Sequence, residues 1–166
     1  LNKKYRFIKK NNKLLDIGAC PGGWSQVSSK IISEGKILSI DIKKMDELKN
    51  VSFLQCDFLQ ESTKEKILYF FGEKLDVVLS DMAADTTGNK SLDCIRTNKL
   101  CAEVVEFSSK ILKPNGVLVS KLFMGDDFLE VKELAKSRFK KVDFFKPEAS
   151  RSESKETYIH CALLKT

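Results

Sequence analysis

The sequence predicts an α/β fold in which a mostly parallel, seven-stranded sheet is covered by helices on both faces. Short apolar runs alternate with longer stretches whose apolar residues recur at helical spacing, which is typical of strand–helix–strand units. The clearest strand is LDVVLSD at residues 75–81, a continuous apolar run suited to burial on both faces. The turn signal KPNG at residues 113–116 separates a long helical pattern from the next apolar run.

The elements follow one another in the order that such a sheet requires. A strand at residues 14–18 leads through a glycine-rich turn into a helix at residues 23–33. Further strands are expected at residues 36–41, 51–55, 75–81, 117–123, 140–146 and 156–164, and further helices at residues 62–71, 92–112 and 127–138. No repeat or low-complexity linker interrupts the pattern, so we expect a single domain over residues 1–166.

Composition limits the classes of protein to be considered. No apolar stretch is long enough to cross a bilayer and no signal-like region begins the chain, so we expect an intracellular protein without a membrane partner. The net charge of +6 is compatible with a polyanionic partner such as RNA. The five cysteines are scattered, with no C-x-x-C pair, which indicates reduced, mostly packed thiols and no metal site.

Polar residues stand where the predicted strands end. In open parallel sheets, ligands bind at the carboxyl ends of the strands. Those ends carry the loop DIGACPGGW at residues 16–24, then Asp41, Asp57 and Asp81, with Lys121 inside the apolar run GVLVSKLF. A single carboxylate could be a helix cap, but a series of them at one edge indicates a binding site.

The loop at residues 16–24 favours one kind of ligand. Its three glycines allow a close backbone approach just before a helix N-terminus. It lacks both the dinucleotide fingerprint and the lysine and hydroxyl of a phosphate-binding loop, which argues against NAD and ATP. S-adenosylmethionine suits this edge of the sheet. The loop could bind its carboxylate, Asp41 its ribose hydroxyls and Asp57 its adenine amino group, and Asp81 could face its cationic end.

Four separated motifs carry a family resemblance. DIGACPGGWSQ, LSDMA with TTG behind it, VSKLF and KPEASRSESKETY resemble, in order and spacing, the FtsJ/RrmJ family of ribosomal RNA large-subunit 2′-O-methyltransferases (RlmE type). The resemblance implies a Rossmann-like, S-adenosylmethionine-dependent methyltransferase fold. It also implies methylation of a uridine ribose in the A-loop of large-subunit ribosomal RNA, within the assembled subunit and in the service of ribosome biogenesis. We expect a monomer in the bacterial cytoplasm, with an organelle as the alternative.

The resemblance also assigns residues. The family's cofactor contacts fall on Gly22, Trp24, Asp41, Asp57 and Asp81. Trp24 has an alternative interpretation as an aromatic residue that packs its helix against the sheet.

The family's catalytic group is a lysine, an aspartate, a second lysine and a glutamate. Asp81, Lys121 and Glu156 match the last three, while the first lysine aligns before Leu1, so we expect a short N-terminal segment of the natural chain to be missing. Lys121 either accepts the proton of the ribose hydroxyl or holds that oxygen in line with the methyl group.

Two further features concern the RNA. Ala84-Asp85 replaces the family's usual Pro-Asn, which should loosen that loop and place a negative charge near the RNA. Basic clusters are candidates for phosphate contacts, although the simpler interpretation of each one alone is a solvated face. They are Lys3-Lys4, Arg6, Lys9-Lys10, Arg138, Lys140-Lys141, Lys146 and Arg151.

Other functions stay open at this point. A relative acting on transfer RNA or an mRNA cap would use the same catalytic group, although the absence of a large extra domain favours the ribosomal type. A catalytically silent RNA-binding assembly factor is supported only by the missing first lysine. An amide-directed protein methyltransferase is disfavoured because no N-P-P-Y motif is present.

Overall fold

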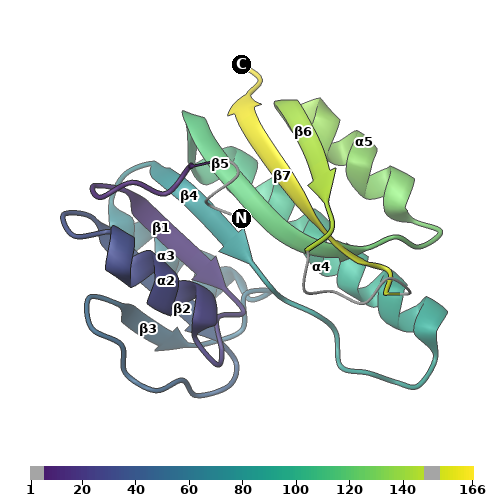
Figure 1. The fold of residues 1–166 in the computed structure, drawn as a ribbon, viewed down its shortest axis with the longest axis horizontal. Helices are drawn as coiled ribbons and strands as arrows, with labels where there is room; N and C mark the ends of the chain where they lie inside the picture. The colour runs from purple at the N-terminus through teal and green to yellow at the C-terminus, as the bar shows by residue number, and fades with distance from the viewer. Residues whose placement is uncertain (1–5, 148–153) are drawn as a thin grey trace.

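The fold is built on a twisted seven-stranded sheet (Figure 1). The structure, a computed structural model, describes residues 6–147 and 154–166. The strands lie in the order β3-β2-β1-β4-β5-β7-β6. Their bounds are β1 Lys13–Ile17, β2 Lys36–Asp41, β3 Ser52–Gln55, β4 Leu75–Ser80, β5 Leu112–Phe123, β6 Phe139–Phe145 and β7 Glu156–Leu164.

Strand direction decides which ends meet. The five neighbouring strands β3, β2, β1, β4 and β5 are parallel to one another, whereas β7 runs antiparallel to both β5 and β6. The chain moves outward from β1 to β2 and β3, then returns to the other side of β1 with β4, so the strand order reverses between β1 and β4. Ligands bind at such a reversal, outside the carboxyl ends of the strands. The mostly parallel, seven-stranded sheet expected from the sequence is confirmed.

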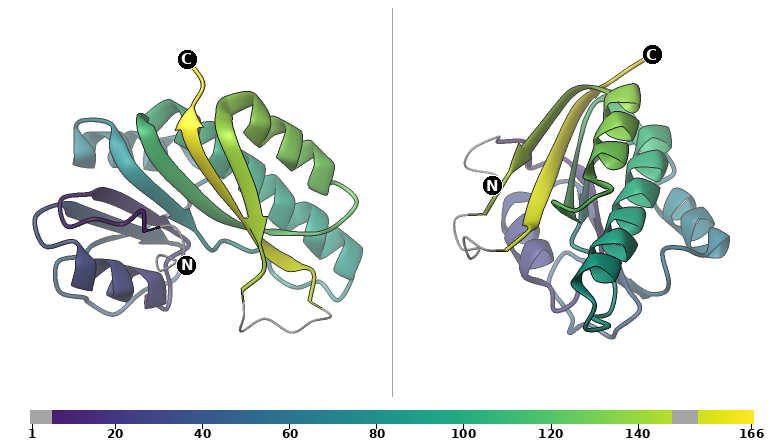
Figure 2. Two further views of the ribbon diagram at one scale, coloured as in Figure 1. Left: turned by 45° about the horizontal axis from the view of Figure 1, so that its top comes forward. Right: turned by 90° about the vertical axis from the view of Figure 1, so that its right-hand side faces the viewer.

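Helices cover both faces, as predicted (Figure 2). The helices are α2 Gly23–Ile31, α3 Glu61–Phe71, α4 Lys90–Ile111 and α5 Phe128–Arg138. One core cluster joins the sheet to α3, α4 and α5, through residues such as Ile67, Val104 and Val131. A second cluster, on the opposite face, includes Trp24 and Ile31 of α2. Among the described residues, no helix is both long and apolar enough to cross a membrane.

The fifth strand differs from its predicted extent. It begins at Leu112, directly after α4, rather than at residue 117. Leu112 already pairs with Leu75 and Val117 pairs with Val77, so residues 113–116 lie opposite Asp76 alone. The predicted turn is therefore a bulge within β5, because the buried Leu112 can join the sheet before the polar residues loop out.

The long helix also begins earlier than expected, at Lys90 instead of residue 92. Asn89 caps it, since its side chain accepts a hydrogen bond from the backbone N–H of Leu92 at 3.1 Å. The predicted strands at residues 36–41 and 156–164 coincide with β2 and β7, and the other predicted elements differ from the observed ones by one or two residues at an end, where local periodicity is least informative.

Candidate active site

The loop after β1 needs glycine for its shape. Gly18 has a φ of +68°, and a Cβ there would lie 2.7 Å from Cγ of Met82. Its backbone N–H donates to the carbonyl of Ile40 at 2.9 Å, which joins the loop to β2. Gly22 has a φ of +116° at the N-terminal cap of α2. These left-handed conformations are accessible to glycine at little cost, so the sequence motif is a requirement of the backbone.

A buried carboxyl group lies beneath this loop. Asp16, on β1, is 1% exposed, and its Oδ2 accepts a hydrogen bond of 2.6 Å from the hydroxyl of Ser25 on α2. The Ser25 hydroxyl also lies 2.6 Å from that of Ser39 on β2. Burial raises the pKa of Asp16 to about 7, against the Ser25 hydrogen bond, which lowers it. Sequence reasoning missed this network, although a carboxylate inside the apolar run LLDIG was a signal for it.

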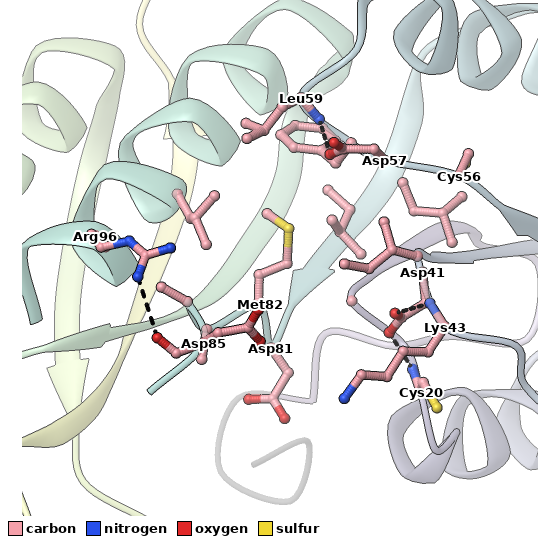
Figure 3. A pocket seen from close by; sticks show the side chains of 18 of the residues that line it. Cys20, Asp41, Lys43, Cys56, Asp57, Leu59, Asp81, Met82, Asp85 and Arg96 are labelled. Carbon is pink, nitrogen blue, oxygen red and sulfur yellow. Dashed lines mark hydrogen bonds between the residues drawn. The ribbon is translucent and has the colours of Figure 1, made fainter. Parts of the chain in front are cut away.

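A pocket of about 600 Å³ opens at the carboxyl ends of β1, β2 and β4 (Figure 3). Asp41, Asp57 and Asp81 all contribute to its lining, as the sequence predicted for the binding edge. Its wall also includes Met82, which lies against Gly18, and Arg96 of α4. Sequence reasoning missed the contribution of α4, because nothing local indicates which helix residues reach the edge of the sheet.

Backbone N–H groups orient two of these carboxylates. Asp41 accepts from the N–H of Cys20 at Oδ2, at 2.9 Å, and from the N–H of Lys43 at Oδ1, at 2.8 Å. Asp57 accepts from the N–H of Leu59 at Oδ1, at 2.9 Å. Both side chains therefore have defined orientations before any ligand arrives (Figure 3).

Lys121 lies between two carboxylates beside the pocket. Its Nζ is 3.2 Å from Oδ1 of Asp81 and 3.6 Å from Oε2 of Glu156. Lys121 comes from β5, Asp81 follows β4, and Glu156 begins β7, and the lysine side chain is only 14% exposed. The structure thus brings together the three residues that resemblance placed in the catalytic group. Asp81 belongs to both the cluster and the pocket lining.

Tyr158 is a member of this cluster that sequence reasoning missed. Its hydroxyl donates to Oδ1 of Asp81 at 2.9 Å, the same oxygen that Lys121 approaches. Burial, reinforced by the nearby Asp81, raises the pKa of Tyr158 above its usual range, so the phenol stays a hydrogen-bond donor. It lies opposite Lys121 across the β5–β7 pair. The signal was the alternation of β7, which places residues 156 and 158 on one face.

Gly22 and Trp24 are not among the residues that line the pocket. The ring of Trp24 packs against Tyr158, with centroids 5.4 Å apart, and contributes to the core cluster on the α2 face. This matches the helix-packing interpretation of Trp24. Direct contact of either residue with a cofactor stays a prediction.

The loop that carries Ala84 and Asp85 is attached to α4. The N–H of Ala84 donates to Oγ1 of Thr97 at 3.1 Å, and Nη1 of Arg96 donates to the carbonyl of Asp85 at 3.4 Å. These contacts hold the loop on the helix without the proline that the family usually has.

Some sequence predictions concern other parts of the chain. Lys3-Lys4 and Arg151 lie outside the described residues. Arg138, another candidate phosphate contact, forms a salt bridge of 2.9 Å with Glu106. All five cysteines are free thiols, and three of them are buried. Within residues 6–147 and 154–166, no group of three or more potential ligands could hold a metal ion.

Comparison with known proteins agrees with this geometry. The chain is 42% identical over 165 residues to a Pelagibacter ubique protein named ribosomal RNA large subunit methyltransferase E, covering 99% of this chain and 81% of the relative. A Rickettsia akari protein of the same name is 44% identical, with 96% and 73% covered.

Solved structures show the same fold. A crystal structure from Plasmodium falciparum, provisionally named a ribosomal RNA methyltransferase, superimposes with a TM-score of 0.86 at 30% identity, covering 98% of this chain and 92% of that one. Human methyltransferase-like protein 13, solved in complex with SAH, reaches a TM-score of 0.69 at 16% identity, with 96% and 75% covered. The family model of FtsJ-like methyltransferases matches residues 1–163. With that match, and with relatives this similar over almost its whole length, the chain belongs to the FtsJ-like methyltransferase family.

Proposed function

We propose that this protein transfers a methyl group from S-adenosylmethionine to a uridine ribose 2′-hydroxyl in the A-loop of large-subunit ribosomal RNA. The observation that carries the proposal is Lys121 Nζ, held between Asp81 and Glu156 beside a pocket lined by oriented carboxylates. The relatives named as ribosomal RNA large subunit methyltransferases support the substrate class.

The residues of the pocket fit the cofactor. Its volume of about 600 Å³ lies within the usual range for small-molecule sites. Asp41, already bound by two N–H groups, keeps carboxylate lone pairs that can accept from ribose hydroxyls, and Asp57 has a second oxygen for the adenine amino group. Asp81 would then face the cationic end. We retain Gly22 and Trp24 as proposed contacts at the glycine loop.

The chain's own residues position the nucleophile. When bound, S-adenosylmethionine supplies an electrophilic methyl group: the ribose oxygen forms the new bond to carbon, the carbon–sulfur bond breaks and S-adenosylhomocysteine is left. Asp81 and Glu156 orient Lys121 Nζ, which contacts the 2′-oxygen and either accepts its proton or aligns it while the proton passes to water.

The test replaces Lys121 in the full-length protein. Lys121→Ala should lower methyl transfer by about 100-fold or more, because it removes the group that contacts the nucleophile, while S-adenosylmethionine affinity stays within about threefold. Single-turnover methylation and calorimetry measure the two quantities.

Lys113→Ala is the matched control. Lys113 lies at the amino end of the same strand, β5, whereas Lys121 lies near its carboxyl end. It forms a similar ion pair, with its Nζ 3.0 Å from Oδ1 of Asp76. Its loss should leave methyl transfer unchanged. Near-normal turnover by Lys121→Ala would remove Lys121 from the mechanism.

Substrate choice needs a separate experiment. Assembled large subunits, naked large-subunit ribosomal RNA and transfer RNA are compared as methyl acceptors, and the product is mapped by mass spectrometry. Assembled subunits should be the best acceptor, with ribose methylation of an A-loop uridine. Preferential methylation of transfer RNA would contradict the ribosomal assignment, and no transfer to any acceptor would favour a silent assembly factor.

The bacterial relatives also support a place of action. We propose that the protein works in the bacterial cytoplasm, since the named relatives come from Pelagibacter and Rickettsia. The monomeric state expected from the sequence stays a prediction. Light scattering of the purified protein would test the oligomeric state.

A further inference from the structure

Two of the five thiols lie in the wall of the pocket. Cys20, in the loop between β1 and α2, and Cys56, directly after β3, both line it and are both partly exposed. The other three thiols are buried in the core, with exposed fractions of 8% for Cys94, 2% for Cys101 and 0% for Cys161. Two cysteines are therefore accessible at the pocket, and the other three are buried elsewhere in the molecule.

Asp41 connects the accessible pair. The backbone N–H of Cys20 donates to Oδ2 of Asp41 at 2.9 Å, and that of Cys56 donates to the carbonyl oxygen of Asp41, also at 2.9 Å. The first contact places Cys20 beside the carboxylate to which we assign the ribose, and the second places Cys56 beside the backbone of the same residue. Both cysteines therefore lie in the part of the pocket lining that contains Asp41.

The environment of these sulfurs leaves them available to reagents. The Sγ of Cys20 lies 3.6 Å from the carbonyl of Lys44, and that of Cys56 lies 3.6 Å from the carbonyl of Leu54. A thiol donates only weakly to a carbonyl, so these contacts cost little to break. Two of the buried thiols are in the opposite situation: burial raises the pKa of Cys101 to about 12 and also raises that of Cys161, which suppresses the reactive thiolate.

We propose that Cys20 and Cys56 form a covalent modification site for α,β-unsaturated carbonyl compounds, and that an adduct on either thiol closes the cofactor pocket. The sulfur forms a bond to the β-carbon of the alkene, the alkene electron pair moves to the α-carbon, and that carbon takes up a proton in place of the one lost from the thiol. The addition has no leaving group and needs no oxidant. The closing of the pocket to cofactor rests on the proposed function, whereas the reactivity of the thiols does not.

N-ethylmaleimide is the probe for a first experiment on the folded protein. Peptide mass spectrometry follows each cysteine with time, and the three buried thiols serve as internal controls. Cys20 and Cys56 should react at least about tenfold faster than the buried set, because the thiolate must be accessible to react. Equal rates for all five cysteines, or no reaction at the pocket pair before unfolding, would overturn the assignment.

A second experiment tests the consequence for the pocket. S-adenosylhomocysteine should slow the labelling of both thiols, and labelling should weaken its binding by more than about tenfold, because an adduct takes up part of the ligand's cavity. The Cys20→Ser/Cys56→Ser variant is compared with itself before and after treatment, and its affinity should not respond to maleimide. Full-strength binding to labelled protein would refute the closure of the pocket.

The two proposals can fail separately. If untreated protein did not bind S-adenosylhomocysteine at all, the proposed function and the closure to cofactor would both be wrong. The per-residue labelling rates would still decide whether Cys20 and Cys56 are the modified thiols.

Discussion

The buried Asp16 should make the stability of this protein depend on pH. Burial is the main cause that moves its pKa from 3.8 to about 7, with smaller contributions from Asp81 and Asp41. The folded state therefore binds the Asp16 proton more tightly than the unfolded state does. Below pH 3.8 both states are protonated and the contribution to stability is fully present, and it is lost as pH rises through about 7.

The size of the effect follows from the shift. About three pKa units at 1.36 kcal/mol each correspond to roughly 4 kcal/mol over the whole range, with a slope of about 1.4 kcal/mol per pH unit near pH 5 that falls to about half at pH 7. Asp16→Asn removes the titration and keeps the shape and an oxygen that can accept from Ser25. Relative to the wild type, this variant should therefore gain about 2.3 kcal/mol of unfolding free energy between pH 5 and pH 7.

Urea unfolding at pH 5, 6, 7 and 8, without cofactor, measures the difference between the two proteins. The difference should rise from pH 5 to pH 7 and level off above it. Ser25→Ala provides an independent check, because the Ser25 hydrogen bond lowers the pKa of Asp16 and its loss should move the plateau to higher pH. Parallel pH profiles for the wild type and Asp16→Asn would refute the reasoning.

Two other substitutions test the packing and the cluster. Tyr158→Phe removes the hydrogen bond to Asp81. In methylation assays kcat should fall by about tenfold, and in urea unfolding the free energy of unfolding should fall by about 1 kcal/mol. An unchanged kcat would show that Tyr158 does not contribute to the reaction. Gly35→Ala places a Cβ that overlaps the carbonyl oxygen of Asn12 and should cost about 1–3 kcal/mol in urea unfolding. Gly23→Ala, whose Cβ meets nothing within 4 Å, should change stability by less than about 1 kcal/mol, and equal effects of the two substitutions would contradict the steric explanation.

Local patterns in the sequence were sufficient for the architecture. The period of apolar residues distinguishes strand from helix, and parallel strands separated by helices must align their carboxyl ends. The sequence therefore predicted that polar residues gather at those ends, and Asp41, Asp57 and Asp81 do line one pocket there, while their roles toward a cofactor stay a prediction. Where the pattern was wrong, at the start of β5, the pairing of Leu112 with Leu75 outweighed a strong local turn signal.

Long-range contacts could not be obtained in this way. Whether Lys121 reaches Asp81 depends on the register of β5 against β4, and whether Glu156 and Tyr158 join them depends on the antiparallel pairing of β7 with β5. The burial that raises the pKa of Asp16 depends on α2 covering β1, and the residues near Asp16 in the sequence do not indicate this contact.

By itself, the sequence determined the order of strands and helices, the edge of the sheet that carries the site and, through its motifs, the family. Only the tertiary structure decided that Lys121 lies between two carboxylates, that Tyr158 shares one of them, and that Cys20 and Cys56 line the pocket while the other thiols do not. The physical reason is that periodicity is a property of neighbouring residues. Distances, burial and pKa shifts arise from segments that are remote in the chain and meet only in the folded sheet.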